Sequence, residues 1–308
     1  MPGVLRRPTS RLNRSDPQAD FSPPFLLHEP ERQFAPFVFD VPHAGDVYPQ
    51  GFLDASRLDA KALRRSEDAH VDRLFAGVTT LGAPLLCARF PRAYLDVNRE
   101  PYELDPRMFD GRLPAYCNTR SMRVAGGLGT VPRIVADGQD IYRGRLAVAD
   151  AAARIDQLYK PYHRALRGLL RRTEEVFGQV VLVDCHSMPS VGLGRDGAAR
   201  ADIVLGDRYG TSCSPALSDL VETVLRDLGY RVIRNKPYAG GFITEHYGVP
   251  AQGRHALQVE IARTLYMDEK TLALSAGFPD LARDLGVAFA RVMDAVGSGL
   301  GPTRMAAE

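Results

Sequence analysis

The stretch that decides the fold is Val-Val-Leu-Val-Asp-Cys-His-Ser at residues 180–187. Its four apolar, mostly β-branched residues predict a strand that is buried on both faces. The acid, thiol, imidazole and hydroxyl that follow lie at the carboxyl end of this strand. Ligands of open α/β sheets bind in the crevice at the carboxyl ends of strands. We therefore expect a functional site at this end.

A second stretch has the same form, Phe-Val-Phe-Asp-Val-Pro-His-Ala-Gly at residues 37–45. It is an apolar run that ends in His43, just as the first run ends in His186. A lone histidine in either place would more often be a hydrogen-bonded interior residue. Two histidines at two strand ends are what a divalent metal site needs, because a catalytic zinc typically takes three protein ligands and leaves one position for water.

Composition excludes several classes of protein. The 308 residues carry 39 basic and 37 acidic side chains, and this near balance of charge gives no reason to expect a nucleic-acid partner. No apolar run reaches 18 residues, so we expect no transmembrane helix and no membrane partner. The four cysteines are scattered without a CxxC pair, which favours reduced thiols in a cytoplasmic protein.

The pattern along the chain predicts a single large domain. Residues 1–24 hold Arg, Pro and Ser without an apolar segment and are expected to form a disordered tail, which leaves 25–300 as one domain. The pattern predicts strands at 36–42, 84–90, 93–97, 179–185, 202–205, 230–234 and 255–261, and helices at 57–81, 143–177 (kinked or split near Pro161), 215–228 and 279–297. Residues 100–140 lack a period and are typical of a functional excursion. The alternation of strands and helices predicts an α/β fold of three layers, α/β/α, with a mostly parallel (mixed) central sheet.

Polar residues gather at the predicted strand ends in an order that resembles the N-formylglutamate amidohydrolase family. The matching segments span roughly residues 36–270 and lie at 42–45, 66–72, 92–99, 161–163, 184–187, 238–242, 244–248 and 255–260. Each segment alone is a weak signal, but the order and the whole set are specific. The resemblance implies a phosphorylase/hydrolase-like fold, similar to that of the zinc carboxypeptidases and of the aspartoacylase group.

The resemblance also implies a metal site. His43 and His186 match the two histidine ligands of the family, and Asp68 is the best match for the acidic ligand. Glu67 beside it is a second choice, and Asp46 is the rival to Asp68, because His43 and Asp46 imitate the H-x-x-E ligand pair of zinc carboxypeptidases. Two imidazoles and a carboxylate leave an open position that suits hydrolysis. We expect one zinc ion per chain, or another divalent metal in its place.

Glu260 is the expected catalytic base. It lies in an apolar strand, where an acid is costly unless it is solvated or paired. A salt bridge to a residue such as Arg263 is the structural alternative. The resemblance to carboxypeptidase-like hydrolases favours a proton shuttle, and burial would raise the pKa of the carboxyl group toward the value that this role needs.

Arginines near residue 95 are the expected substrate contacts. In the related deacylases a D-L-N-R segment binds a substrate carboxylate, and an upstream arginine polarises the scissile carbonyl. The sequence Asp-Val-Asn-Arg at residues 96–99 matches that segment, so the resemblance implies that Asn98 and Arg99 bind a carboxylate and that Arg92 is catalytic. Structural salt bridges to Asp96 or Glu100 are the alternative for both arginines.

Two further histidines are ambiguous. His246 follows a Gly-Gly turn, where a substrate contact is plausible, and His163 lies in a predicted helix, where it could belong to a polar network of the core. Ser187 lacks the G-x-S-x-G context of a serine nucleophile.

The resemblance implies a zinc-dependent amidohydrolase that cleaves the amide bond of an N-acyl amino acid, as an N-formylglutamate deformylase does, by metal-activated water. The expected partner is this small substrate. A carboxypeptidase-like hydrolase of short peptides or cell-wall amides and a catalytically inactive metal-binding homologue are the alternatives. The 100–140 excursion would lie across the cleft for a small substrate and leave it open for a peptide. The oligomeric state stays open.

Overall fold

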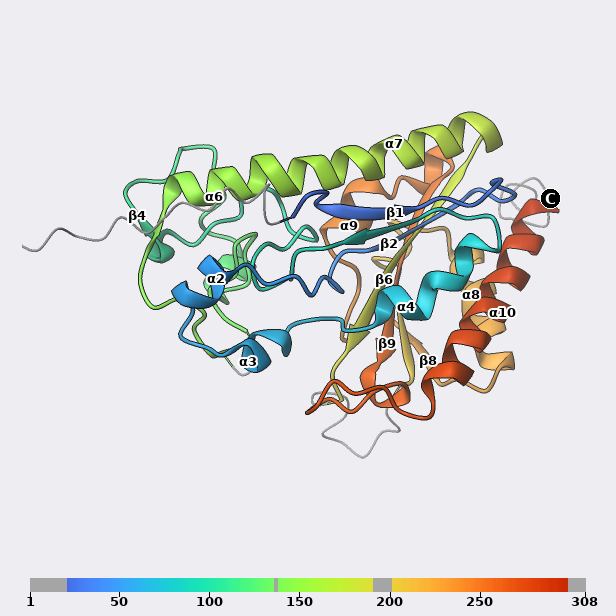
Figure 1. Cartoon of the computed structure of the whole chain (residues 1–308). Helices are drawn as coiled ribbons and strands as arrows, with labels where there is room; N and C mark the ends of the chain where they lie inside the picture. Colours follow the sequence, from blue (N-terminus) through green and yellow to red (C-terminus); the bar gives the residue numbers. More distant parts are fainter. Residues whose placement is uncertain (1–20, 136–137, 191–200, 299–308) are drawn as a thin grey trace, which may run out of the picture.

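A mixed seven-stranded sheet forms the centre of the molecule (Figure 1). The computed structural model describes residues 21–135, 138–190 and 201–298 of the chain. Along the sheet the strands are β1 (Phe25–His28), β3 (Leu85–Ala88), β2 (Phe37–Val41), β6 (Val180–Met188), β9 (Arg254–Ala262), β7 (Ile203–Gly206) and β8 (Val232–Arg234).

The four central strands, β3, β2, β6 and β9, are parallel to one another. β1 is antiparallel to β3, β7 is antiparallel to β9, and β8 is parallel to β7. The expected mixed and mostly parallel sheet is therefore confirmed. The longest pairing joins β6 to β9 and sets His186 opposite Glu260, so two of the expected site residues come from adjacent strands at one edge.

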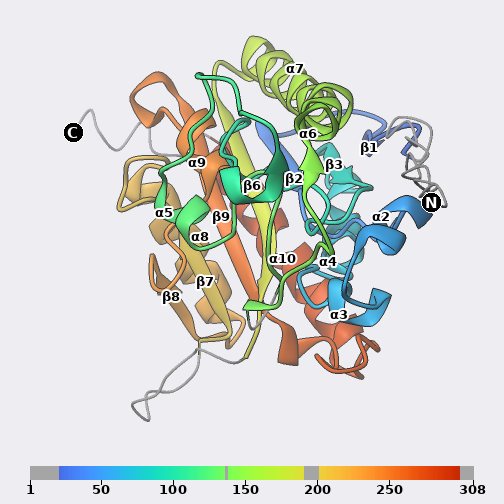
Figure 2. The ribbon, with the colours of Figure 1, turned by 90° about the vertical axis from the view of Figure 1, so that its left-hand side faces the viewer.

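Helices cover both faces of this sheet, which confirms the three layers (Figures 1 and 2). One face carries α6 (Val148–Arg154) and α7 (Lys160–Phe177), and the other carries α4 (Val71–Phe75), α8 (Pro215–Asp227) and α10 (Phe278–Gly297). Alternate residues of β2 enter the two cores: Phe37 and Phe39 pack into the core that contains α10, and Val38 packs into the core that contains α7. This alternation is why β2 reads as a continuous apolar run.

The described part of the 100–140 excursion lies beyond the main sheet, at the end of the molecule opposite α10 (Figure 1). It contains α5 (Met122–Ala125) and β4 (Phe109–Asp110), which pairs with β5 (Leu146–Ala147) in a second small sheet. The remaining short helices are α2 (Gln50–Ala55), α3 (Ala60–Arg64) and α9 (Phe242–Tyr247). None of the helices in the described ranges is long and apolar enough to cross a membrane.

Several predicted elements differ from the structure. The helix predicted at 57–81 is broken into α3 and α4, and the strand predicted at 93–97 is a series of turns. The long helix predicted at 143–177 begins at Val148 and passes through a π-helical turn, Ile155–Tyr159, just before Pro161. Strand β1 was not predicted. Residues 21–24, assigned to the tail from the sequence, include Phe21, which is fully buried against Phe90 and Tyr94.

Candidate active site

The two histidines expected to bind a metal lie at the carboxyl ends of neighbouring strands. β2 and β6 pair in parallel, so His43, just after β2, and His186, near the end of β6, reach the same edge of the sheet. Asp68 joins them from the segment before α4, where its amide N–H donates to the His43 carbonyl oxygen at 3.0 Å. One ligand atom from each of the three residues lies within 4.8 Å of the other two, and no residue of the three is more than 3% exposed.

The chemistry of these three residues fits a divalent cation. The Nε2 atoms of His43 and His186 each lie 2.7 Å from a carboxylate oxygen, of Asp96 and Asp184 respectively. Because a carboxylate only accepts, the Nε2 atom of a neutral ring in either position would donate its proton, which would leave Nδ1 with the lone pair that a metal needs. The two Nδ1 atoms are 3.1 Å apart, and Asp68 Oδ2 lies 3.0 Å from that of His186 and 3.4 Å from that of His43. Three electron-pair donors that face one point are suited to share a cation.

The other oxygen of Asp68 is held by neighbours. Its Oδ1 accepts hydrogen bonds from Arg263 Nη2 at 3.1 Å and from Ser187 Oγ at 3.3 Å. Burial alone would raise the pKa of Asp68, but without a metal the hydrogen bonds that His186 and His43 donate hold that pKa well below its usual range. Arg263, which the sequence offered as a partner for Glu260, is thus bound to Asp68.

The alternative acidic ligands lie elsewhere. Asp46 is exposed to solvent. Glu67 is buried, but its carboxylate accepts from Tyr48 Oη at 2.6 Å and from Arg64 Nε at 3.0 Å. Of the three acids considered, only Asp68 joins the two histidines in the cluster that could hold a metal.

Glu260 lies beside this cluster, 6% exposed, on the strand next to His186. Gln258 Nε2 donates to Glu260 Oε1 at 2.7 Å, and Gln258 Oε1 accepts from the N–H of Gly241 at 2.7 Å. Burial raises the pKa of Glu260 to about 7, although the nearby His186 lowers it. A carboxyl group with this pKa can both take up and release a proton near neutral pH.

Asp96 contacts both of the arginines that were expected to act on the substrate. Arg92 Nε donates to Asp96 Oδ2 at 3.0 Å, and Arg99 Nε lies 3.6 Å from the same oxygen. Arg99 also donates to two main-chain oxygens, of Leu128 at 3.0 Å and of Asn98 at 2.7 Å. Burial lowers the pKa of Arg99 to about 10, so the side chain stays charged at neutral pH. The salt bridges to Asp96 that the sequence offered as an alternative are therefore present for both arginines.

The amide of Asn98 is used inside the protein. Its Nδ2 donates to Asp184 Oδ2 at 3.0 Å and lies 3.0 Å from His186 Nε2. Its Oδ1 accepts from the N–H of Ile243 at 2.8 Å. Asn98 thus links two parts of the site: the Asp184 carboxylate, which lies beside His186, and the start of α9. In the structure Asn98 is therefore a positioning residue. Its predicted contact with substrate stays a prediction.

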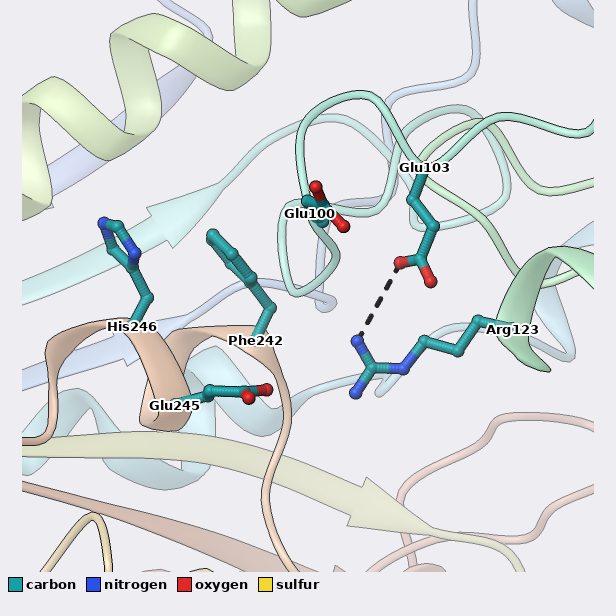
Figure 3. A pocket seen from close by; sticks show the side chains of 6 residues that line it. All are labelled: Glu100, Glu103, Arg123, Phe242, Glu245 and His246. Atoms are coloured by element: carbon teal, nitrogen blue, oxygen red, sulfur yellow. Dashed lines mark ion pairs between the residues drawn. The ribbon is translucent and has the colours of Figure 1, made fainter. Parts of the chain in front are cut away.

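His246 lies at the exposed end of α9, and its ring stacks on that of Phe242 with the ring centroids 5.0 Å apart. Both line a cavity of about 380 Å³, and its other lining residues are Glu100, Glu103, Arg123 and Glu245 (Figure 3). Burial lowers the pKa of His246, which favours the neutral ring. His246 therefore lies at a cavity, as a substrate contact would require. The cavity is not lined by His43, Asp68 or His186, the residues that could hold a metal.

His163 is a structural residue of the core. Its Nε2 donates to the Val97 carbonyl oxygen at 2.9 Å, and its Nδ1 lies 2.8 Å from Tyr247 Oη. Burial lowers the pKa of His163 to about 3, so the ring is neutral and both of its nitrogens are occupied.

No role was expected for Gln258, and Arg263 was considered only as a salt-bridge partner of Glu260. Gln258 stands two residues before Glu260, so both side chains lie on one face of β9. That spacing of two was the available signal. Arg263 follows the strand and reaches Asp68 across 195 residues of sequence, and no local signal could have paired them.

The fold and these contacts define a class of protein: a three-layer α/β scaffold whose sheet edge carries two histidines, an aspartate and a buried glutamate. The model of the N-formylglutamate amidohydrolase family matches residues 35–267. The chain belongs to this family, and it is a hydrolase that acts on an amide C–N bond.

Particular relatives are similar over most of the chain. The N-formylglutamate deformylase of Pseudomonas putida is 30% identical over 237 residues, which are 76% of this chain and 82% of that protein. The crystal structure of N-formylglutamate amidohydrolase from Ralstonia eutropha JMP134 superposes with a TM-score of 0.85 at 40% identity, and the match covers 90% of this chain and 99% of that chain. The Atu2144 gene product of Agrobacterium tumefaciens shares the fold, with a TM-score of 0.64 at 18% identity over 88% of this chain and 94% of that chain.

Proposed function

We propose that the chain is a zinc-dependent amidohydrolase that removes the acyl group from an N-acyl amino acid of the N-formylglutamate type. The observation that carries this proposal is the convergence of His43, Asp68 and His186 beside the buried Glu260. The names of the relatives support an N-formyl group as the acyl group.

Glu260 would act as the proton shuttle. A zinc ion held by His43, Asp68 and His186 would supply a Lewis acid that polarises the amide carbonyl and acidifies the attacking water. Glu260 would take the proton of that water and pass it to the leaving amine nitrogen. Its burial supports both steps, because burial raises the pKa of this carboxyl group toward neutral pH, where it can accept and then release a proton.

The two arginines would divide the work of binding. Arg92 uses Nε for Asp96, and its terminal nitrogens would stabilise the charge that develops on the carbonyl oxygen. Arg99 would hold the α-carboxylate of the substrate, with Asn98 fixing the main chain beside it. An arginine suits this task because its fork meets carboxylate oxygens in pairs.

The names of the relatives favour a small substrate over a peptide, and the 100–140 segment adds a cavity beside α9. Glu100, Glu103 and Arg123 come from this segment and form one side of the cavity at α9. A volume of about 380 Å³ is in the range of small-molecule sites. The shuttle and both arginines are present, which argues against an inactive metal-binding homologue. The cytoplasmic location expected from the sequence is kept in this proposal, and all four cysteines are free thiols.

The proposal is tested by metal analysis together with amide hydrolysis. The purified protein is expected to hold about one zinc-class ion per chain and to hydrolyse N-formyl amino acids in a panel that includes glutamate and glutamine. His43→Ala and His186→Ala should lose both properties, whereas the control His28→Ala, at an exposed edge strand, should keep them. Full metal content in both site variants, or turnover that a chelator leaves unchanged, would overturn the proposal.

A further inference from the structure

Gln258 is a buried amide in the centre of the sheet, and the mechanism above gives it no task. It is 5% exposed. It lies on β9, between Asp184 of β6 and Gly206 of β7, so the main chain at this position is bonded on both sides (Figure 2). An amide buried away from water is unfavourable unless its nitrogen and oxygen form hydrogen bonds. The partners of the Gln258 side chain therefore show what the residue does.

The orientation of the Gln258 amide is fixed by the main chain before α9. Its Oε1 atom accepts from the N–H of Gly241 at 2.7 Å, and its Nε2 atom donates to Glu260 Oε1 at 2.7 Å. A main-chain N–H can only donate, so it must face the amide oxygen. The NH₂ group is then the end that faces Glu260. Gln258 therefore offers a hydrogen-bond donor to the candidate proton shuttle.

The Gly241 N–H is itself kept in one place by Asn98. Gly241 packs so closely against the Asn98 side chain that a Cβ atom would not fit there. Two residues further on, the N–H of Ile243 donates to Asn98 Oδ1 at 2.8 Å, and Asn98 is 2% exposed. The first turn of α9 is thus packed against a buried side chain. The donor that orients the Gln258 amide cannot easily move.

The contact with Gln258 leaves one oxygen of Glu260 available. Oε1 accepts from Gln258, and no other residue of the described ranges donates to the Glu260 carboxylate. The unpaired Oε2 atom is not among the fully enclosed side-chain atoms of the described chain, so it remains open to solvent. A proton shuttle needs one such free oxygen within reach of the attacking water.

We propose that Gln258 is a positioning residue for the amide hydrolysis. Its NH₂ group binds Glu260 Oε1 and thereby directs Oε2 toward the attacking water and the leaving nitrogen. The inference rests on the proposed function, because it describes how the proton shuttle of that function is oriented. A catalytic group that is displaced by about 1 Å can lose on the order of 10²-fold in rate. One directed hydrogen bond to a flexible glutamate side chain is therefore enough to matter.

A purely structural role for Gln258 is the alternative. In that case the side chain would only connect the start of α9 to the sheet, and this task needs the amide oxygen alone. The NH₂ contact with Glu260 would then have no effect on turnover. The structural role predicts a loss of stability only, whereas positioning predicts a loss of kcat, so kinetics can separate them.

Replacing Gln258 with methionine is the first test. Methionine has a similar length but neither donates nor accepts as an amide does. We expect metal-loaded Gln258→Met to keep its metal and to lose about 10- to 100-fold in kcat for an N-formyl amino acid. KM should stay within about 2-fold of the wild-type value, because the change affects the reacting group and not the binding of substrate. A wild-type kcat in the folded, metal-loaded variant would overturn the inference.

Ser212→Ala is the matched control. Ser212 is 1% exposed, and its Oγ atom donates to the Ala256 carbonyl oxygen at 2.9 Å, on the same strand β9. This variant also removes a buried hydrogen bond to β9, but Ser212 has no contact with Glu260. Both variants should lower the midpoint of chemical denaturation, and only Gln258→Met should lower kcat. An equal fall of kcat in both would assign the effect to the strand and overturn the inference.

If Gln258→Met does not fold, Gln258→Asn tests the same contact with a polar side chain. Asparagine is one carbon shorter, which draws the amide back by about 1.5 Å from both partners. The same loss of kcat is expected, with the metal retained. A kcat equal to that of the wild-type protein would overturn the inference.

Crystal structures of the wild-type protein and the folded variant supply a readout that does not depend on turnover. We expect the Glu260 carboxyl group to leave its wild-type position once the donor is removed. If the metal-loaded wild-type protein hydrolyses no N-formyl amino acid, the proposed function fails, and this comparison still judges the inference. A displaced Glu260 carboxyl group supports positioning by Gln258, and an unchanged one overturns it.

Discussion

Replacing Glu260 with glutamine should remove activity and, in the metal-free protein, increase stability. The amide cannot shuttle a proton, so turnover should fall on the order of 10²-fold or more with the metal retained. Glutamine keeps an oxygen that can accept from Gln258 Nε2, the one hydrogen bond that the described structure gives to Glu260 Oε1. The shape of the site is also kept, so the change isolates the charge.

The gain in stability follows from the raised pKa of Glu260. A rise from 4.5 to about 7 corresponds to a difference of up to about 3 kcal/mol in the free energy of unfolding, since one unit is about 1.4 kcal/mol. The folded state holds its proton more tightly than the unfolded state, so the wild-type protein loses stability as the pH rises from about 4.5 to about 7. Above about pH 7 the full difference from Glu260→Gln should appear, and near pH 4 the two proteins should be equally stable.

The measurements are chemical and thermal denaturation of both chelated proteins at about pH 4 and about pH 8, together with steady-state kinetics of the metal-loaded proteins. Chelation is needed because a bound cation would lower the pKa of a nearby carboxyl group. Thermal midpoints at about pH 8 should differ on the order of 5 °C. Equal stability at about pH 8 would refute the burial argument, and a near-wild-type kcat with bound metal would mean that the proton shuttle is another residue.

The remaining predictions concern the metal and the substrate. Asp68→Ala should lose the metal and Asp46→Ala should retain it; loss only in the second variant would reverse the assignment of the acidic ligand. Arg99→Lys should mainly raise KM, because lysine keeps the charge but not the fork, whereas Arg92→Lys should mainly lower kcat. N-formyl amino acids should be hydrolysed far faster than their α-amides or α-esters, and equal kcat/KM would remove the carboxylate anchor. Asp96→Asn should lower metal affinity about 10- to 100-fold in competition titrations, since it weakens the partner that orients one histidine ligand.

Local sequence was informative where one strand carries both its apolar run and its polar end. The predicted strands at 36–42, 179–185 and 255–261 correspond to β2, β6 and β9. Burial on both faces requires continuous apolar residues, and the carboxyl edge is where such a run can end in polar side chains. The pattern of the three segments was therefore enough to assign the two histidines and Glu260 to one edge of the sheet.

The secondary structure predicted from local sequence was wrong for two segments that are buried but whose main-chain hydrogen bonds are not those of a strand or a continuous helix. Residues 93–97 are mostly apolar and buried, as a strand would be, but they form turns that carry Asp96 to His43. The helix predicted at 57–81 is interrupted between α3 and α4, where Asp68 turns toward the histidines. An apolar pattern reports that a segment is buried, but it does not report which main-chain groups bond to one another.

The sequence by itself determined the class of fold, the family and the kinds of side chain at the sheet edge, because these depend on patterns within single segments. Only the tertiary structure showed that Asp68 is the acid beside the histidines and that the Asn98 amide forms its hydrogen bonds with Asp184 and α9. The distance between Glu103 and Arg123, which is too long for a hydrogen bond, is also visible only there. These outcomes depend on distances between segments far apart in the chain. A change of about one ångström in such a distance decides whether a side chain can bind the metal or only lies near it. No pattern within one segment of the sequence specifies that distance.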